Sequence, residues 1–239
     1  MITGTNREAR ITKGRGPITP PLPWGPHYGG QSGISVDRVR SKQQIKTEAE
    51  RELLVHATDR LRRGDLEGAR DDFSAALEIN PGSLIALVNR GSLRYLLGDT
   101  AGALADLTAA IRLDPACDLA HFDRGVIHLE LADFGPAERD FGRIVSCGRA
   151  DAEVYTNRGI ARYGLGQLEA ALDDFDRAVE RDSGALLARF YRARMSDQHG
   201  NIDRALEDVN ICLSRAPPDS PLWAAAQLVR RSITRRLAS

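Results

Sequence analysis

The chain contains 239 residues, of which 42% are hydrophobic and 28% charged, and its 33 basic and 33 acidic side chains leave no net charge. No uncharged run approaches the roughly 18 apolar residues of a membrane-spanning helix, and residues 1–25 contain no apolar segment typical of a signal peptide. Three scattered cysteines are too few for a disulfide framework and fit a reducing compartment. We therefore expect a cytoplasmic protein without a membrane partner.

The charge is distributed unevenly along the chain. Residues 1–49 carry eight basic and three acidic side chains, whereas residues 50–219 carry 21 basic and 30 acidic ones. The last twenty residues contain four arginines and no acid. An acidic middle argues against a nucleic-acid groove there, so we expect no nucleic-acid partner.

Residues 1–40 form the first predicted unit, an extended basic arm. The stretch RGPITPPLPWGPHYGGQSG is rich in proline and glycine and shows no helical or strand period, so polyproline character is expected around 17–23. Its PPLP motif weakly resembles ligands of WW domains. Because solvating linkers are usually poor in aromatic residues, we expect four apolar side chains of the arm to bind an acidic protein surface: Ile18, Leu22, Trp24 and Tyr28. That surface belongs either to the acidic middle of the same chain or, as we favour, to a separate partner.

The region from about residue 41 to 219 is predicted to be helical and contains an internal repeat. The stretches VNRGSLRYLLGD at 88–99 and TNRGIARYGLGQ at 156–167 lie 68 residues apart, which is twice 34. Blocks of 34 residues beginning at 50, 84, 118, 152 and 186 all have alanine at their twentieth position: Ala69, Ala103, Ala137, Ala171 and Ala205. The twenty-fourth position is always large and apolar: Phe73, Leu107, Phe141, Phe175 and Val209. Small residues allow two helices to approach closely, and the large one fills the space between them.

The fifteenth position of the block predicts the turn between two helices. It is glycine in four blocks and alanine in the third, and Asp, Asn or Gln follows in every block. Glycine there can take a left-handed conformation that ends the first helix. The polar residue after it can cap the second helix.

With these residues the chain resembles the tetratricopeptide repeat family, whose 34-residue unit is a pair of antiparallel helices. The resemblance implies an all-α, right-handed α-solenoid with repeats at 50–83, 84–117, 118–151, 152–185 and 186–219. One pair cannot bury its own apolar face, so neighbouring pairs must stack. Residues 220–239 begin with Ser-Pro and carry an apolar stripe, which predicts a C-terminal capping helix.

A second recurring pattern involves charge. The twenty-third position is aspartate in every block: Asp72, Asp106, Asp140, Asp174 and Asp208. The seventh position is arginine in all but the first: His56, Arg90, Arg124, Arg158 and Arg192. Arginine suits carboxylate pairing because its planar fork binds both oxygens. We predict a ladder of Arg–Asp pairs that fixes the register of stacking; the alternative is that these are solvated helix faces.

The family resemblance implies that partners bind along the concave face, formed by the first helix of each pair. The predicted partner-binding residues are Val88, Asn89, Tyr95, Phe122, Asp123, Val126, Asn157, Ile160, Tyr163, Phe190, Tyr191 and Arg194. Asn89 and Asn157 are suited to hydrogen-bonding an extended peptide backbone. Residues 50–219 contain no lysine, and Asp123 would repel a terminal carboxylate, so a carboxylate-binding groove is disfavoured. Alternatively, the apolar members of the set simply contact neighbouring helices.

No pattern of catalytic or metal-binding residues stands out. There is no phosphate-binding glycine loop, nucleophile elbow or HExxH motif. His121 and His128 are about 10 Å apart by helix rise, too far to share an ion without other ligands. Asp173 and Asp174 are consecutive in a predicted helix and should point apart. We expect no enzyme activity, no cofactor and no metal site.

The sequence thus predicts a non-catalytic scaffold that binds a protein or an extended peptide through the concave groove and the arm. One alternative is a structural subunit of a large assembly, anchored by the arm, with cytoskeletal or ciliary assemblies as examples. Another is a regulatory module that acts in trans on an enzyme.

Overall fold

The protein is described here by a computed structural model, which covers residues 47–238. Within this range the chain forms eleven α-helices and no strand. The five pairs of helices are α1 (Glu48–Arg62) and α2 (Leu66–Ile79), α3 (Leu84–Leu96) and α4 (Thr100–Leu113), α5 (Asp118–Glu130) and α6 (Phe134–Ser146), α7 (Ala152–Gly164) and α8 (Leu168–Arg181), and α9 (Leu186–Gln198) and α10 (Ile202–Arg215). A single helix, α11 (Pro221–Leu237), follows them.

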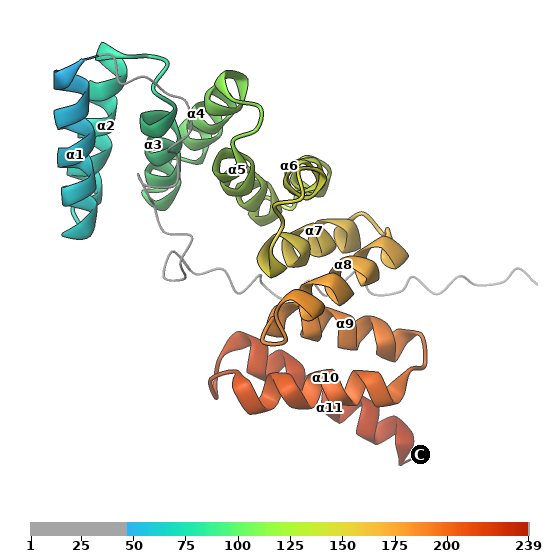
Figure 1. The fold of residues 1–239 in the computed structure, drawn as a ribbon. Coiled ribbons are helices and arrows are strands. Elements are labelled where there is room, and N and C mark those ends of the chain that lie inside the picture. The colour runs from blue at the N-terminus through green and yellow to red at the C-terminus, as the bar shows by residue number, and fades with distance from the viewer. Residues whose placement is uncertain (1–46, 239) are drawn as a thin grey trace, which may run out of the picture.

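Consecutive helices pack against each other as hairpins, and the hairpins stack in chain order along a curved path (Figure 1). The helix α11 lies on α10 and also contacts α9. Its Ala226 and Ile233 are fully buried, while Leu222 and Val229 pack against the core beside them. The predicted all-α solenoid of helical pairs is therefore confirmed.

The turn inside each pair has the predicted backbone conformation. The four glycines at the fifteenth position have positive φ angles, at Gly64, Gly98, Gly166 and Gly200. Ala132 takes the same left-handed region in the third pair, with φ 55°. In three repeats the next residue caps the second helix by accepting a backbone N–H, as Asp65 does from Gly68 at 3.0 Å. The same turn geometry therefore recurs between the two helices of each pair.

The core lies where the two helices of a pair cross. The five alanines at the twentieth position and the five large residues at the twenty-fourth are all fully buried. Gly159, at the eighth position of the fourth repeat, is required by close approach, because a Cβ atom there would lie 2.7 Å from the Phe175 ring. A small residue on one helix thus makes room for an aromatic ring on the other, as the sequence predicted.

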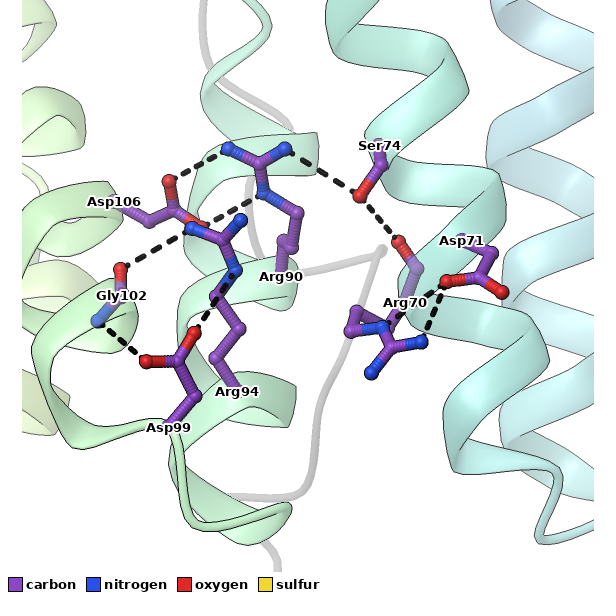
Figure 2. A network of polar contacts seen from close by, with 8 residues as sticks. All are labelled: Arg70, Asp71, Ser74, Arg90, Arg94, Asp99, Gly102 and Asp106. Atoms are coloured by element: carbon purple, nitrogen blue, oxygen red, sulfur yellow. Dashed lines mark hydrogen bonds and ion pairs between the residues drawn. The ribbon is translucent and has the colours of Figure 1, made fainter.

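The predicted ladder of arginine and aspartate is confirmed in four repeats. Arg90 holds Asp106 through two hydrogen bonds of 2.8 and 2.7 Å, and Figure 2 shows the pair. The equivalent two-bond pairs are Arg124–Asp140, Arg158–Asp174 and Arg192–Asp208. In the first repeat Asp72 lies 3.3 Å from Arg60, which stands at the eleventh position of its block.

Each aspartate of the four pairs also contacts a second basic side chain. In the second and fourth repeats it comes from the eleventh position, as Arg94 and Arg162. In the third and fifth it comes from the fourth position, as His121 and Arg189. Two donors per carboxylate offset the cost of burying its charge.

Three of these four arginines also connect neighbouring repeats. Arg90 donates to Ser74 in the preceding second helix at 3.4 Å, and Arg124 donates to Thr108 at 3.1 Å. Arg192 reaches Asp176 in the same way at 2.9 Å. A guanidinium held by its own repeat and the previous one fixes how the two stack, which supports the register role expected from the sequence.

Candidate functional site

The first helices of the repeats line one side of the stack, which we call the inner face. Each of α3, α5 and α7 contacts the next first helix as well as its own partner. Within residues 47–238 the second helices of successive repeats have no comparable contact. The inner face is therefore the side on which the stack curves inward, as the family resemblance implied.

Polar contacts cross the inner face between successive repeats. The hydroxyl of Ser92 donates to Asp123, and that of Tyr95 donates to Glu130. Further along, Arg194 donates to the Tyr163 hydroxyl at 3.3 Å and lies over the Tyr163 ring. These pairs include side chains that were predicted to bind a partner. Some of the hydrogen bonds of these side chains therefore join neighbouring repeats.

The predicted partner-binding residues fall into two groups by burial. Four are almost completely buried in the core: Val88, Ile160, Phe190 and Tyr191. Six remain half-buried on the inner face: Tyr95, Phe122, Asp123, Val126, Tyr163 and Arg194. The first group contacts neighbouring helices, which is the alternative that the sequence left open for the apolar members.

The two asparagines differ in their surroundings. Asn89 is buried and donates from Nδ2 to the Ile85 carbonyl at 2.8 Å. Asn157 is 1% exposed, and neither its Nδ2 nor its Oδ1 has a hydrogen-bond partner within the described chain. Leaving a buried polar group unpaired costs about 1–3 kcal/mol, and such groups need an explanation. Among the described residues, Asn157 is the one side chain with two such unpaired buried atoms.

Asn157 lines a pocket of about 460 Å³ at the C-terminal end of the inner face. The pocket is formed by the start of α7, the turn into α9, the start of α9, and the segment leading into α11. Its lining is mainly apolar: Ala152, Ala185, Leu186, Leu187, Ala216, Pro217, Pro221 and Leu222. Thr156, Ser220, Glu153 and Asp182 complete it together with Asn157. Its volume and lining fit the usual range for ligand sites.

Acidic side chains dominate the electrostatics of this end of the inner face. The pocket lining includes Glu153 and Asp182 but no basic residue. Burial raises the pKa of Asp123 to about 6, an effect opposed by the Ser92 hydrogen bond and reinforced by Glu153. Burial and then Asp151 raise the pKa of Glu153. Burial and a neighbouring carboxylate therefore both disfavour the charged forms of Asp123 and Glu153.

Several pocket residues were not predicted from the sequence. Glu153 and Leu187 stand at the second position of their blocks, which the repeat pattern assigns to the groove. These two residues could therefore have been predicted from the sequence. Pro221 and Leu222 lie beyond the last repeat, where no period could place them. The predicted arm residues Ile18, Leu22, Trp24 and Tyr28 lie outside the described residues.

The side chains considered for catalysis or metal binding have structural partners. His121 binds Asp140 at 2.9 Å, and His128 lies 3.3 Å from Asp133. Among residues 47–238, no group of three or more His, Cys, Asp or Glu side chains is placed to hold a metal ion. No helix in this range is both long and apolar enough to cross a membrane.

The fold is a curved stack of helical pairs that ends in one extra helix. Small and aromatic residues recur in it with a fixed period. These features define a helical-repeat protein. The model of the tetratricopeptide repeat matches residues 54–116, 90–151 and 156–221. The chain therefore belongs to the tetratricopeptide repeat family, whose members generally mediate protein–protein interactions.

Solved structures with the same fold support this assignment. One is MamA from Desulfovibrio magneticus RS-1, with a TM-score of 0.64 and 20% identity over 78% of this chain and 97% of that one. Another is YrrB, described as having an unusual peptide-binding site, with a TM-score of 0.63 and 20% identity over 73% and 90%. A third comes from Parabacteroides merdae, with a TM-score of 0.67 and 23% identity over 80% and 77%. No curated protein sequence matches the chain significantly.

Proposed function

We propose that the protein is a non-catalytic scaffold that binds an extended peptide segment of a partner protein along its inner face. The observation that carries the proposal is Asn157, a buried side chain with two unpaired polar atoms at the edge of an open, mainly apolar pocket. An amide side chain offers both a donor and an acceptor, which is what an extended peptide backbone requires. YrrB, which has the same fold, is described as binding a peptide.

The half-buried aromatic residues support the same proposal. Tyr95 and Phe122 lie on the inner face with part of their surface open to solvent. Rigid aromatic side chains are common binding anchors, and Tyr95 adds a polar hydroxyl to its apolar ring. The basic arm at residues 1–40 provides a second proposed contact, with an acidic partner surface. Nothing among the related structures favours a cytoskeletal or ciliary assembly, so the proposal includes neither location.

Site-specific photo-crosslinking in the cells that make the protein tests the proposal. A photoreactive phenylalanine analogue replaces Tyr95 on the inner face in one variant and the exposed Glu78 of α2 in a matched variant. We expect the Tyr95 variant to crosslink to a defined protein and the Glu78 variant to do so much less. Equal crosslinking at both positions, or crosslinks at Glu78 alone, would contradict binding at the inner face.

A further inference from the structure

We propose that the pocket between α7, α9 and α11 selects a peptide in which an aliphatic residue stands next to lysine or arginine. The inference rests on the proposed function and specifies the peptide that the inner face recognises. It assigns one role to each part of the pocket. The apolar walls take the aliphatic side chain, Asn157 binds the peptide backbone, and the carboxylates of Glu153 and Asp182 attract the cation.

The apolar walls select the aliphatic side chain. Leu186 and Leu187 at the start of α9 line the pocket together with Leu222 at the start of α11. These three leucines are half-buried and pack against the core, which holds their surfaces in place. Burying an aliphatic side chain removes apolar area from water on both sides of the contact. The volume of about 460 Å³ accommodates one such side chain with the adjoining main chain.

Asn157 recognises the main chain rather than a side chain. Both of its polar atoms lack partners, and it is held in α7 between the ladder residue Arg158 and the buried Thr156. The neighbouring Thr156 hydroxyl donates to the Ala152 carbonyl at 2.7 Å and makes no hydrogen bond to Asn157. An extended peptide presents N–H and C=O groups along its edge, so a peptide that displaces the atoms now covering the Asn157 amide can pair with both of its polar atoms.

Charge selects the neighbouring residue. Glu153 and Asp182 line the pocket from two different elements, with no basic residue among the lining side chains. Asp182 keeps one oxygen on the Gly184 backbone N–H at 2.7 Å, which leaves its other oxygen for a ligand. Asp123 adds negative charge close to Glu153. A lysine or arginine is attracted to this end of the face, while an acidic residue or a terminal carboxylate is repelled.

The test is titration of the isotope-labelled full chain with short peptides, followed by NMR. The probe is acetyl-Gly-Lys-Leu-Gly-amide, and its two matched controls replace the lysine by glutamate or the leucine by serine. The backbone amide signals of Leu187 and Leu222 report on the pocket in every variant. We expect these signals to shift with the probe. The glutamate control should bind about fivefold more weakly, the upper range for loss of a surface ion pair, and the serine control should also bind more weakly because it buries no aliphatic side chain.

Variants of the protein assign the effect to the pocket. Glu153→Gln should weaken probe binding severalfold, whereas the charge-matched Asp173→Asn, on the exposed face of α8, should leave it unchanged. Asn157→Leu keeps the branched shape and the number of heavy atoms but removes the amide, and should also weaken binding while circular dichroism shows unchanged helicity. Equal affinity for the lysine and glutamate peptides, or full binding by Asn157→Leu, would overturn the inference.

Two other occupants of the pocket are distinguished without added peptide. If replacing Arg7, Arg10, Lys13 and Arg15 by serine shifts the Leu187 signal, the pocket holds the chain's own first residues and the inference falls. If the Leu187 signal instead depends on protein concentration, the occupant is a second copy of the chain, and the inference is likewise wrong. Crosslinking at Tyr95 with no probe binding at the pocket would leave the proposed function intact and reject this inference alone.

Discussion

Arg158 and Asp174 join the two helices of the fourth repeat through a two-bond ion pair that is almost completely buried. The Nε of Arg158 lies 2.9 Å from Oδ2 of Asp174, whose side chain is fully shielded from solvent. Arg162 donates to the same Oδ2 at 3.0 Å and also reaches Glu138 of the third repeat. One carboxylate therefore organises two arginines, one of which connects neighbouring repeats.

The first prediction concerns this carboxylate. Asp174→Ala should lower the free energy of unfolding by about 3–5 kcal/mol, because it leaves two arginines without their buried partner. The adjacent Asp173 provides a matched control, since its ion pair with Arg177 is half exposed and follows i,i+4 spacing. Asp173→Ala should cost no more than about 1 kcal/mol. Urea denaturation measures both, and similar losses for the two variants would contradict a structural role for the ladder.

The second prediction compares two helical glycines. An alanine at Gly159 would place its Cβ 2.7 Å from the Phe175 ring, so Gly159→Ala should destabilise the protein by roughly 1–3 kcal/mol through overpacking. At Gly142 the nearest atom to an added Cβ is 3.9 Å away, so Gly142→Ala should stabilise by about 0.5–1 kcal/mol through helix propensity. Thermal unfolding followed by circular dichroism should show shifts of opposite sign. Two shifts of the same sign would mean that packing at Gly159 is looser than described.

The repeat period accounts for how much of this fold the sequence could predict. Alanine at Ala171 and phenylalanine at Phe175 occupy fixed positions of the block, so their packing recurs and can be read from spacing. The second basic partner of each aspartate could not be found in this way. It comes from the eleventh position at Arg162 but from the fourth at Arg189, and only the folded hairpin brings both positions to the same carboxylate.

The binding site was predicted less completely, for a physical reason. Asn157 was identified because the sixth position of a block faces inward, and the structure leaves its amide unpaired. Ile160 at the ninth position and Phe190 at the fifth were assigned to the same face, yet the close approach of neighbouring first helices buries them. The pocket itself depends on Pro221 and Leu222, which follow the last repeat. A periodic pattern cannot place residues where the period ends.

The third prediction is a pH dependence of stability that originates at Asp123. Its pKa rises from 3.8 to about 6 on folding, mainly through burial. Between these values the folded state binds more protons than the unfolded state, so the contribution of Asp123 to stability decreases as pH rises from about 4 to 6. The loss is at most about 3 kcal/mol for a shift of this size.

Asp123→Asn isolates this contribution, because the asparagine carbonyl can still accept the hydrogen bond from Ser92. Urea denaturation of both proteins at pH 4.5 and pH 7 provides the measurement. The variant should gain stability relative to the wild type at pH 7 and lose most of that gain at pH 4.5. Asp173→Asn serves as the exposed control. A constant difference between Asp123→Asn and wild type at the two pH values would show that Asp123 does not titrate in this range.

The last prediction is that Asn157 lowers the stability of the unliganded protein. Both polar atoms of its buried side chain lack partners, so Asn157→Leu should raise the free energy of unfolding by about 1–3 kcal/mol, the cost of an unsatisfied buried group. Asn89 provides the comparison, because its amide already donates to Ile85 at 2.8 Å, and Asn89→Leu should bring no such gain. Stability commonly decreases where a site is kept ready for a ligand. Urea denaturation in the absence of peptide decides the matter: a less stable Asn157→Leu would mean that the amide is satisfied within the folded chain and is not held ready for a partner.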